Sequence, residues 1–274
     1  MKNTLATSIK RRQLLASFAS AGVLNALAFS ARAAEPEQGP ARKLGLIFPP
    51  AGRGVPEEGL AMYGANIEYL IENLGLETMT PEGYEAVLDR IGPSAERLAS
   101  RGAEAVVVAG TSLTFFKGEA YNQEVTWLAR AATGLPATTM STAVIDGLKA
   151  VGATRIVAPT AYNEEVNDRL RAFLVEHGFE VLGVQGLGVE AVEDINRVTQ
   201  PDLLEFCVRV AQSAPEADAI LVSCGGLRTL EILAPLESRM SRPAVTSMPH
   251  ALYYGAKLLG MDARVNGYGR LIAS

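Results

Sequence analysis

The sequence predicts an α/β fold of two pseudo-repeated Rossmann-like halves. Each half should have a parallel sheet of the four-stranded type, with a site in the cleft between the halves. Apolar strand-like runs alternate with helical segments, the order expected of parallel strands joined by crossovers. The 26 glycines and 6% aromatic residues fit many tight strand-to-helix turns. Two similar strand-and-turn units, VVVAGTS at 106–112 and ILVSCGG at 220–226, begin 114 residues apart.

Local patterns assign the elements of the first half. An apolar run at 44–48, ended by two prolines, is the first strand. Thr80 as N-cap and Pro81 at the first helical position begin a helix expected to reach Gly102, with an interruption at Gly92–Pro93. The run 105–109 lacks polar alternation, as a fully buried strand does. Helices are expected at 120–133, with Trp127 in the core, and at 141–151.

The second half repeats this alternation. A strand at 155–158 precedes a strongly amphipathic helix at 162–178. The remaining expected elements, in chain order, are a strand at 179–183, a helix at 202–213, a buried strand at 219–223, a helix at 230–240, a strand at 244–247 and a helix at 251–259.

The first 33 residues have the features of an export signal. Arg11-Arg12 precedes an apolar, small-residue stretch at 16–29, and Ala31-Arg32-Ala33 fits an A-x-A cleavage site. The alternative, a membrane anchor, is disfavoured because the stretch is short and interrupted by Asn25. A twin-arginine signal cleaved near Ala33 predicts a periplasmic protein.

The expected organisation is a signal at 1–33, a linker at 34–43, α/β halves at 44–152 and 153–250, and a C-terminal helix and tail at 251–274. Without the signal, 20 basic and 30 acidic residues give a net charge of −10. This charge argues against nucleic acid and anionic membranes as partners, but leaves a small anionic substrate open. The oligomeric state stays open, a monomer included.

Chemistry concentrates at the two repeated turns. Cys224 ends a buried strand, and Gly225 and Gly226 let the backbone approach a ligand with its amides exposed. Cys224 should face the N-terminus of the next helix, where amides lower a thiol pKa. This context favours a functional cysteine over an ordinary buried one. Cys207 lies among apolar helix residues and is predicted to belong to the core, although a disulfide with Cys224 is conceivable in an oxidising compartment.

The first turn carries Gly110, Thr111 and Ser112. The two hydroxyls suit an anion, and plain N-capping explains them about as well. Tyr162 follows the 155–158 strand and could reach the same cleft. The hydroxyl-rich segment at 138–142 is best explained by capping.

No cofactor is indicated by the sequence. No GxGxxG opens a helix, and neither a Walker lysine motif nor HExxH is present. Two cysteines and two histidines, His177 and His250, leave little for a metal site. His177 precedes Gly178 at a helix end, where a histidine complements the dipole.

Motifs along the whole chain carry a resemblance to a known family. They are PPAGRGVP at 49–56, LGLETMTPEGYEAV at 74–87, GTSLTFFKG at 110–118, TGLPATTMSTAV at 133–144, TAYNEEVNDRL at 160–170, SCGGLRTL at 223–230 and GYGRL at 267–271. With them the chain resembles the Asp/Glu racemase superfamily and, within it, the arylmalonate decarboxylases. Racemases and maleate isomerases of this superfamily have a cysteine in both turns, whereas Gly110 occupies the first position here.

The resemblance implies a cofactor-free decarboxylase of disubstituted aryl or vinyl malonates that gives one enantiomer. Cys224 would protonate an enediolate on one face. A dioxyanion hole for the retained carboxylate would comprise Thr111, Ser112, Tyr162 and the amides of Cys224, Gly225 and Gly226. An apolar pocket around the leaving carboxylate would comprise Leu76, Met79, Val192 and Ile195, which ordinary core packing would also explain.

The sequence leaves two alternative functions open. The first is a racemase or maleate-isomerase-type enzyme of the same superfamily, against which the missing second cysteine weighs. The second is an exported dicarboxylate-binding protein, which would bind without turnover and without dependence on Cys224.

Overall fold

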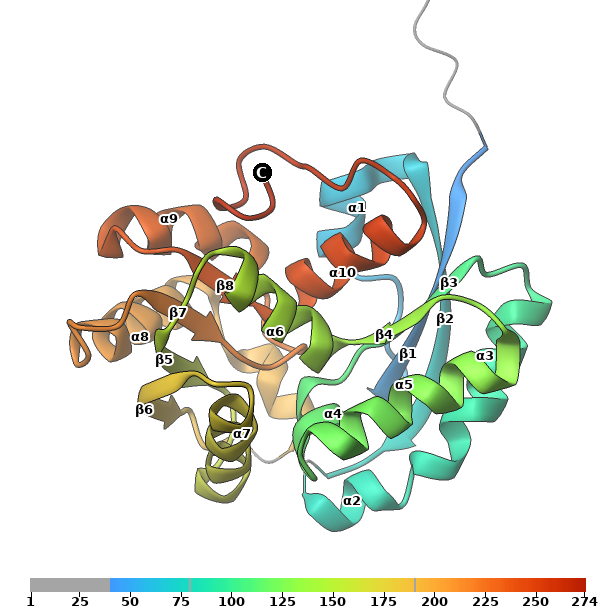
Figure 1. Cartoon of the computed structure of the whole chain (residues 1–274), viewed down its shortest axis with the longest axis horizontal. Coiled ribbons are helices and arrows are strands. Elements are labelled where there is room, and N and C mark those ends of the chain that lie inside the picture. The colour runs from blue at the N-terminus through green and yellow to red at the C-terminus, as the bar shows by residue number, and fades with distance from the viewer. Residues whose placement is uncertain (1–39, 79, 190) are drawn as a thin grey trace, which may run out of the picture. The chain divides into compact units, whose positions relative to one another are not determined.

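Two parallel four-stranded sheets form the framework of the protein (Figure 1). The computed structural model describes residues 40–78, 80–189 and 191–274, except for the side chain of Val192. The proposed signal at 1–33 therefore lies outside the described residues. The first sheet has the order β2-β1-β3-β4 and the second β6-β5-β7-β8, with every pair parallel. The identical order confirms the predicted pseudo-repeat. The strands are β1 (Arg42–Pro50), β2 (Ile67–Leu76), β3 (Ala105–Val108), β4 (Ala137–Thr139), β5 (Arg155–Thr160), β6 (Glu180–Gly186), β7 (Ala219–Val222) and β8 (Ala244–Thr246).

The helices of the first half differ from expectation in the stretch 80–102, and the short helices at 57–63 and 111–115 were not predicted. Thr80 caps α2 by accepting from the Gly83 amide at 3.3 Å, as predicted. The interruption comes earlier than expected, at residues 86–90, and Gly92 and Pro93 lie in the first turn of α3. There the missing amide hydrogen of a proline costs no helical bond. The helices are α1 (Glu57–Tyr63), α2 (Pro81–Glu85), α3 (Ile91–Ser100), α4 (Thr111–Phe115), α5 (Glu119–Thr133) and α6 (Met140–Ala150), with 3-10 turns at Gly64–Asn66 and Leu88–Arg90.

Asparagine and threonine N-caps begin two helices of the second half. Asn163 accepts from the Val166 amide at the start of α7, and Thr199 accepts from the Asp202 amide at the start of α8. The last helix begins at Ser247, directly after β8, and not at 251 as the sequence suggested. The helices are α7 (Glu164–Glu176), α8 (Gln200–Gln212), α9 (Leu230–Met240) and α10 (Ser247–Leu258), with a 3-10 segment at Val192–Arg197.

Two edge strands, β2 and β4, were not predicted from the sequence. β2 reads IEYLIENLGL and is only partly buried, because it pairs on one side alone. Its acidic and amide side chains therefore interrupt the apolar run that marks a central strand. β4 has three residues and lies within the hydroxyl-rich segment assigned to capping. That capping also occurs, because Thr139 accepts from the Thr142 amide at 3.0 Å and begins α6.

The helix that follows the fourth strand of each sheet packs against the opposite sheet. Helix α6 contacts β7 and β8, α10 contacts β3 and β4, and the two helices pack on each other between the sheets (Figure 1). A β-carbon on Gly255 of α10 would lie 2.7 Å from Leu44, and one on Gly147 of α6 would lie 3.0 Å from Val245. Glycine at these positions permits the close approach of helix and sheet that joins the two halves.

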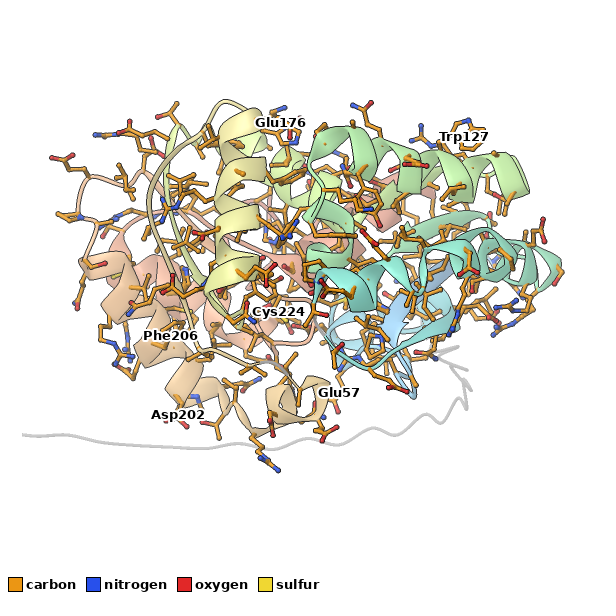
Figure 2. The ribbon with its side chains drawn as sticks, turned by 90° about the horizontal axis from the view of Figure 1, so that it is seen from below. Glu57, Trp127, Glu176, Asp202, Phe206 and Cys224 are labelled. Atoms are coloured by element: carbon orange, nitrogen blue, oxygen red, sulfur yellow. The ribbon has the colours of Figure 1, made fainter. Side chains whose placement is uncertain are left out.

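The core consists of the inner strands and the helix faces packed on them. Val106, Val107 and Val108 are fully buried, as a central parallel strand requires. Cys207 is also fully buried, which confirms its assignment to the core. The prediction for Trp127 is wrong: the side chain is 64% exposed and projects outward from α5 (Figure 2). The apolar neighbours of Trp127 face the other side of α5, and the indole is a single exposed apolar group.

Among the described helices, none is both long enough and apolar enough to cross a membrane.

Candidate active site

Both repeated turns open into one cavity at the carboxyl ends of the strands. The cavity measures about 440 Å³ and is lined by residues that follow β1, β2, β3 and β7, together with the 3-10 segment 192–197. Parallel sheets place ligands at this edge. The labelled Cys224 lies inside the fold, whereas Trp127 and Glu176 lie at its outer edge (Figure 2). Of the predicted site residues, those on the cavity wall are Leu76, Gly110, Thr111, Ser112, Ile195, Cys224, Gly225 and Gly226.

Cys224 has an unusual backbone conformation. Its φ of +152° lies in the region that L-residues rarely adopt, and such strain persists only where surrounding contacts hold it. The Cys224 amide donates to Ser247 Oγ at 3.1 Å, and the adjacent Ser223 amide donates to the Pro159 carbonyl at 3.0 Å. These bonds hold the turn on both sides, so the thiol is fixed against the cavity.

The sulfur of Cys224 is buried, and burial raises the pKa of the thiol above its ordinary value. Backbone amides of Gly226 and Leu227 and the positive charge of Arg53 act in the opposite direction, but more weakly. The sequence predicted that the N-terminus of the next helix lowers the pKa of Cys224. This prediction is wrong, because the amides near the sulfur belong to the turn and α9 begins only at Leu230. The resting group is therefore a thiol.

The N-terminus of α9 is occupied by a buried carboxyl group. Glu58 Oε1 accepts from the amides of Thr229 at 2.9 Å and Leu230 at 3.2 Å. Burial raises the pKa of Glu58 to about 7, and the nearby charge of Glu231 adds to the rise, while the two amides and Arg53 oppose it. The amides of this helix are thus engaged by the protein itself.

The first turn is not a side-chain N-cap. Gly110 is the capping residue of α4, without a side-chain cap bond. The Thr111 hydroxyl instead donates its proton to Ser247 Oγ at 2.9 Å, and Met140 Sδ at 3.0 Å is the alternative acceptor. A β-carbon on Gly110 would lie 2.3 Å from Pro49 Cγ, closer than real contacts allow. Neighbouring atoms therefore crowd the position where the related racemases have a second thiol.

Tyr162 lies behind the cavity wall and not on it. The side chain is 1% exposed, its hydroxyl lies 3.2 Å from Ser223 Oγ, and its ring contacts Phe115 edge-on. Burial and the nearby Cys224 raise the pKa of Tyr162 well above 10, so the hydroxyl keeps its proton and acts as a donor. Ser112, in contrast, lines the cavity, although most of its surface is buried.

Two of the four residues predicted for the apolar pocket line the cavity. Leu76 ends β2 and Ile195 lies in the 3-10 segment, and both line the cavity. Ile195 covers the glycine turn so closely that a β-carbon on Gly226 would lie 3.0 Å from it. Met79 and the side chain of Val192 lie outside the described residues.

Several site residues were not found from the sequence. Ser247 joins the two turns, and Met140 packs against both Thr111 and Gly225. A signal for them exists, because ATTMS at 137–141 and AVTSM at 244–248 are similar segments, each of which spans the fourth strand of a sheet and the start of the next helix. Tyr84 was also missed: its fully buried hydroxyl lies close to Ser112 and Cys224, and makes no hydrogen bond of good geometry within the described residues.

The arrangement combines a proton donor with hydrogen-bond donors and an apolar wall. The thiol of Cys224 on the second turn and Gly110 on the first turn line the same cavity. Hydroxyl groups and turn amides can bind a carboxylate. In the described part of the chain, no three His, Cys, Asp or Glu side chains are grouped as metal ligands.

Comparisons with known proteins agree on one family. A family model for arylmalonate decarboxylase matches residues 44–272. Arylmalonate decarboxylase from Bordetella bronchiseptica is 44% identical over 229 residues, 83% of this chain and 95% of that protein. A crystal structure of a liganded double mutant of arylmalonate decarboxylase superposes with a TM-score of 0.82 at 42% identity, covering 84% of this chain and 98% of that one.

The fold extends to enzymes of another activity. The maleate isomerase Iso from Pseudomonas putida S16 superposes with a TM-score of 0.80 at 18% identity, covering 85% of this chain and 99% of that chain. At this identity the likeness concerns the fold of two four-stranded parallel sheets, which it confirms.

Proposed function

The chain belongs to the arylmalonate decarboxylase family, and from this premise we propose that it removes CO2 from disubstituted aryl or vinyl malonates without a cofactor. Family membership makes it a decarboxylase, a carbon–carbon lyase. The observation that carries the finer proposal is the single buried thiol of Cys224 facing a cavity whose opposite turn has Gly110.

The retained carboxylate binds between the two turns. Thr111 and Ser112 supply hydroxyl donors from the cavity wall, and the amides of Gly225 and Gly226 supply backbone donors next to Cys224. Tyr162 lies behind this wall, so its hydroxyl takes part in the hole only if it exchanges its contact with Ser223 for the carboxylate. Each preorganised donor to a developing oxyanion is worth about 3–4 kcal/mol in the transition state. The amide of Cys224 donates to Ser247 in the resting structure, so its part in the hole requires a shared or exchanged bond.

The second carboxylate enters the apolar part of the cavity, beside Leu76 and Ile195. An ionised carboxylate is costly in an apolar site, whereas neutral CO2 is not. The bond between the α-carbon and this carboxylate breaks, CO2 leaves, and the electron pair moves through the α-carbon onto the oxygens of the retained carboxylate. An aryl or vinyl substituent delocalises this charge further, so such substrates react best.

Cys224 then transfers its proton to the α-carbon, and the enediolate collapses to the carboxylate of the monoacid. The thiolate recovers a proton from solvent, so one CO2 leaves and one proton is consumed per turnover. Burial supports this role, because the raised pKa of Cys224 keeps the sulfur protonated before the reaction. Since no second acid stands at Gly110, protonation occurs on one face and gives one enantiomer.

The cellular context is part of the proposal. The Arg11-Arg12 segment supports export through a twin-arginine signal, cleaved near Ala33, to the periplasm. Cys207 and Cys224 are free in the structure and form no disulfide with each other, which leaves the Cys224 thiol available for the proposed reaction. The proposed partner is a small dicarboxylate, with neither nucleic acid nor a membrane surface as a binding partner.

Release of CO2 from phenylmalonate and methylphenylmalonate by the purified full chain, without added cofactor, tests the proposal. Cys224→Ala should abolish turnover while it leaves binding of the dicarboxylate intact. Cys207→Ala is the matched control, because this thiol is remote in the core and should not affect turnover. Binding without CO2 release by the native chain would instead support a dicarboxylate-binding protein, and deuterium exchange into an added chiral monoacid would support a racemase.

A further inference from the structure

Arg53 is a cation on the cavity wall that has no anionic partner among the residues that the structure describes. It follows β1 and lines the same cavity as Cys224. Its backbone is held by Asn73, which accepts from the Arg53 amide at 3.2 Å and donates to the Arg53 carbonyl at 3.1 Å. The guanidinium lies over the ring of Phe48, with Cζ 5.5 Å from the ring centroid. The loop and the stacking contact thus keep the charge at the cavity.

Neighbouring charges do not neutralise this guanidinium. Within the described residues, no carboxylate forms an ion pair with Arg53 and no acceptor receives a hydrogen bond from its side chain. By contrast, Arg228 pairs with Glu57 at 2.6 Å. The charge of Arg53 is felt inside the site, because it lowers the pKa of both Cys224 and Glu58 relative to burial alone.

Two acidic residues, Glu77 and Glu193, also line the cavity. Both are exposed, and neither forms a described contact with Arg53. Water screens exposed carboxylates effectively, so their repulsion of an anion bound at Arg53 is weak. The five N–H groups of a guanidinium, in contrast, match a carboxylate in a bidentate arrangement.

We propose that Arg53 binds an anionic group on the substituent of the substrate, so that the preferred substrates are arylmalonates with a further carboxylate on the ring. This inference rests on the proposed decarboxylation. The malonate carboxylates themselves are poor partners for Arg53. The retained one is held at the turns, and a cation beside the leaving one would stabilise the ground state and slow the loss of CO2.

The cavity has room for such a substrate. Its volume of about 440 Å³ lies within the range of pockets that hold drug-sized ligands. Phe48 and Arg53 line one wall, with the guanidinium over the Phe48 ring, so a substituent that extends along this wall directs its carboxylate to the guanidinium. The anion is then fixed at the far end of the substituent, away from the reacting carbon.

Competition between phenylmalonate and 3- or 4-carboxyphenylmalonate tests the proposal. The native chain should favour one of the carboxylated substrates in kcat/KM, and Arg53→Leu should lower that preference roughly 10- to 100-fold, the effect of one charged hydrogen bond. Arg53→Lys should restore part of the preference. Arg228→Leu is the matched control, because it removes a nearby cation whose charge is already paired. A preference that stays within about threefold in Arg53→Leu would overturn the proposal.

A binding measurement separates this inference from the proposed function. The affinities of phenylacetate and 3- and 4-carboxyphenylacetate, measured by calorimetry, require no turnover. If the native chain binds a carboxylated acid more tightly than phenylacetate and Arg53→Leu loses this difference, the anion site is supported. This holds even if phenylmalonate releases no CO2, in which case only the decarboxylation proposal fails. Equal affinities for the three acids in the native chain would refute the anion site.

Discussion

The buried carboxyl group of Glu58 should make the stability of the protein fall as pH rises. Its pKa is about 7 in the folded chain, against an ordinary value of 4.5. Folding therefore favours the protonated form, and the stabilisation is complete below about pH 4.5 and is lost as pH rises to about 7. Because a tenfold change in a protonation equilibrium is worth about 1.4 kcal/mol, the loss amounts to about 3 kcal/mol.

Glu58→Gln isolates this contribution. A neutral amide keeps an oxygen that accepts from the amides of Thr229 and Leu230, and it removes the group that titrates. The variant should have about the native free energy of unfolding at pH 4.5 and exceed it by about 3 kcal/mol at pH 8. Glu57→Gln is the matched control, because the adjacent Glu57 is 74% exposed and should give no such pH-dependent difference.

Urea unfolding at pH 4.5, 6 and 8 measures the effect as the difference between variant and native chain. The difference is required because other groups titrate in the same range. Burial lowers the pKa of His250 to about 4 and raises that of Asp146. His250 and Asp146 contribute equally to the pH dependence of stability in the variant and in the native chain, so their contributions cancel in the difference. The contribution of Glu58 does not cancel, because only the native chain has this carboxyl group. A difference that is constant across the three pH values would refute the reasoning.

Three further predictions concern the two turns. Gly110→Ala should destabilise the fold by about 1–3 kcal/mol in urea unfolding, because its β-carbon would meet Pro49 Cγ at 2.3 Å, and a second change, Pro49→Ala, should recover most of the loss. Thr111→Val should lower kcat about 10²- to 10³-fold in the CO2 assay while costing only about 1 kcal/mol of stability; an unchanged kcat would remove Thr111 from the oxyanion hole. Iodoacetamide should label Cys224 alone in the native chain, at a rate that still rises above pH 9 because the pKa is raised. Labelling of the buried Cys207, whose pKa is about 12, would contradict the described core.

The fold was predictable because its central strands are apolar without interruption. VVV at 106–108 and ILV at 220–222 are buried from both faces, and a run of this kind can be recognised in one sequence. β2 was not recognised, because an edge strand exposes one side and admits glutamate and asparagine. Trp127 was misassigned for a related reason: local pattern gives a helical face, but packing decides how far each side chain is covered.

The site was predictable where chemistry is local to a turn. The SCGG motif places a thiol beside flexible, amide-rich backbone, and the structure brings it to the same cavity as Gly110 and Thr111. Glu58 and Arg53 could not be identified in this way. Glu58 meets its partner Thr229 across 171 residues, and Arg53 is one of many arginines until the fold places it on the cavity wall. Such roles arise from proximity that no short motif encodes.

One hydroxyl group explains how both halves together form a single site. Ser247 Oγ accepts from the Thr111 hydroxyl of the first turn and from the Cys224 amide of the second, and Ser247 itself begins the helix that packs on the first sheet. The strained φ of Cys224 is therefore held by a residue whose own position depends on the contact between the halves. Strain at a reactive residue persists only if the surrounding contacts overdetermine it. The exchange of α6 and α10 between the sheets thus does more than join the halves, because it fixes the position of the thiol on the cavity wall.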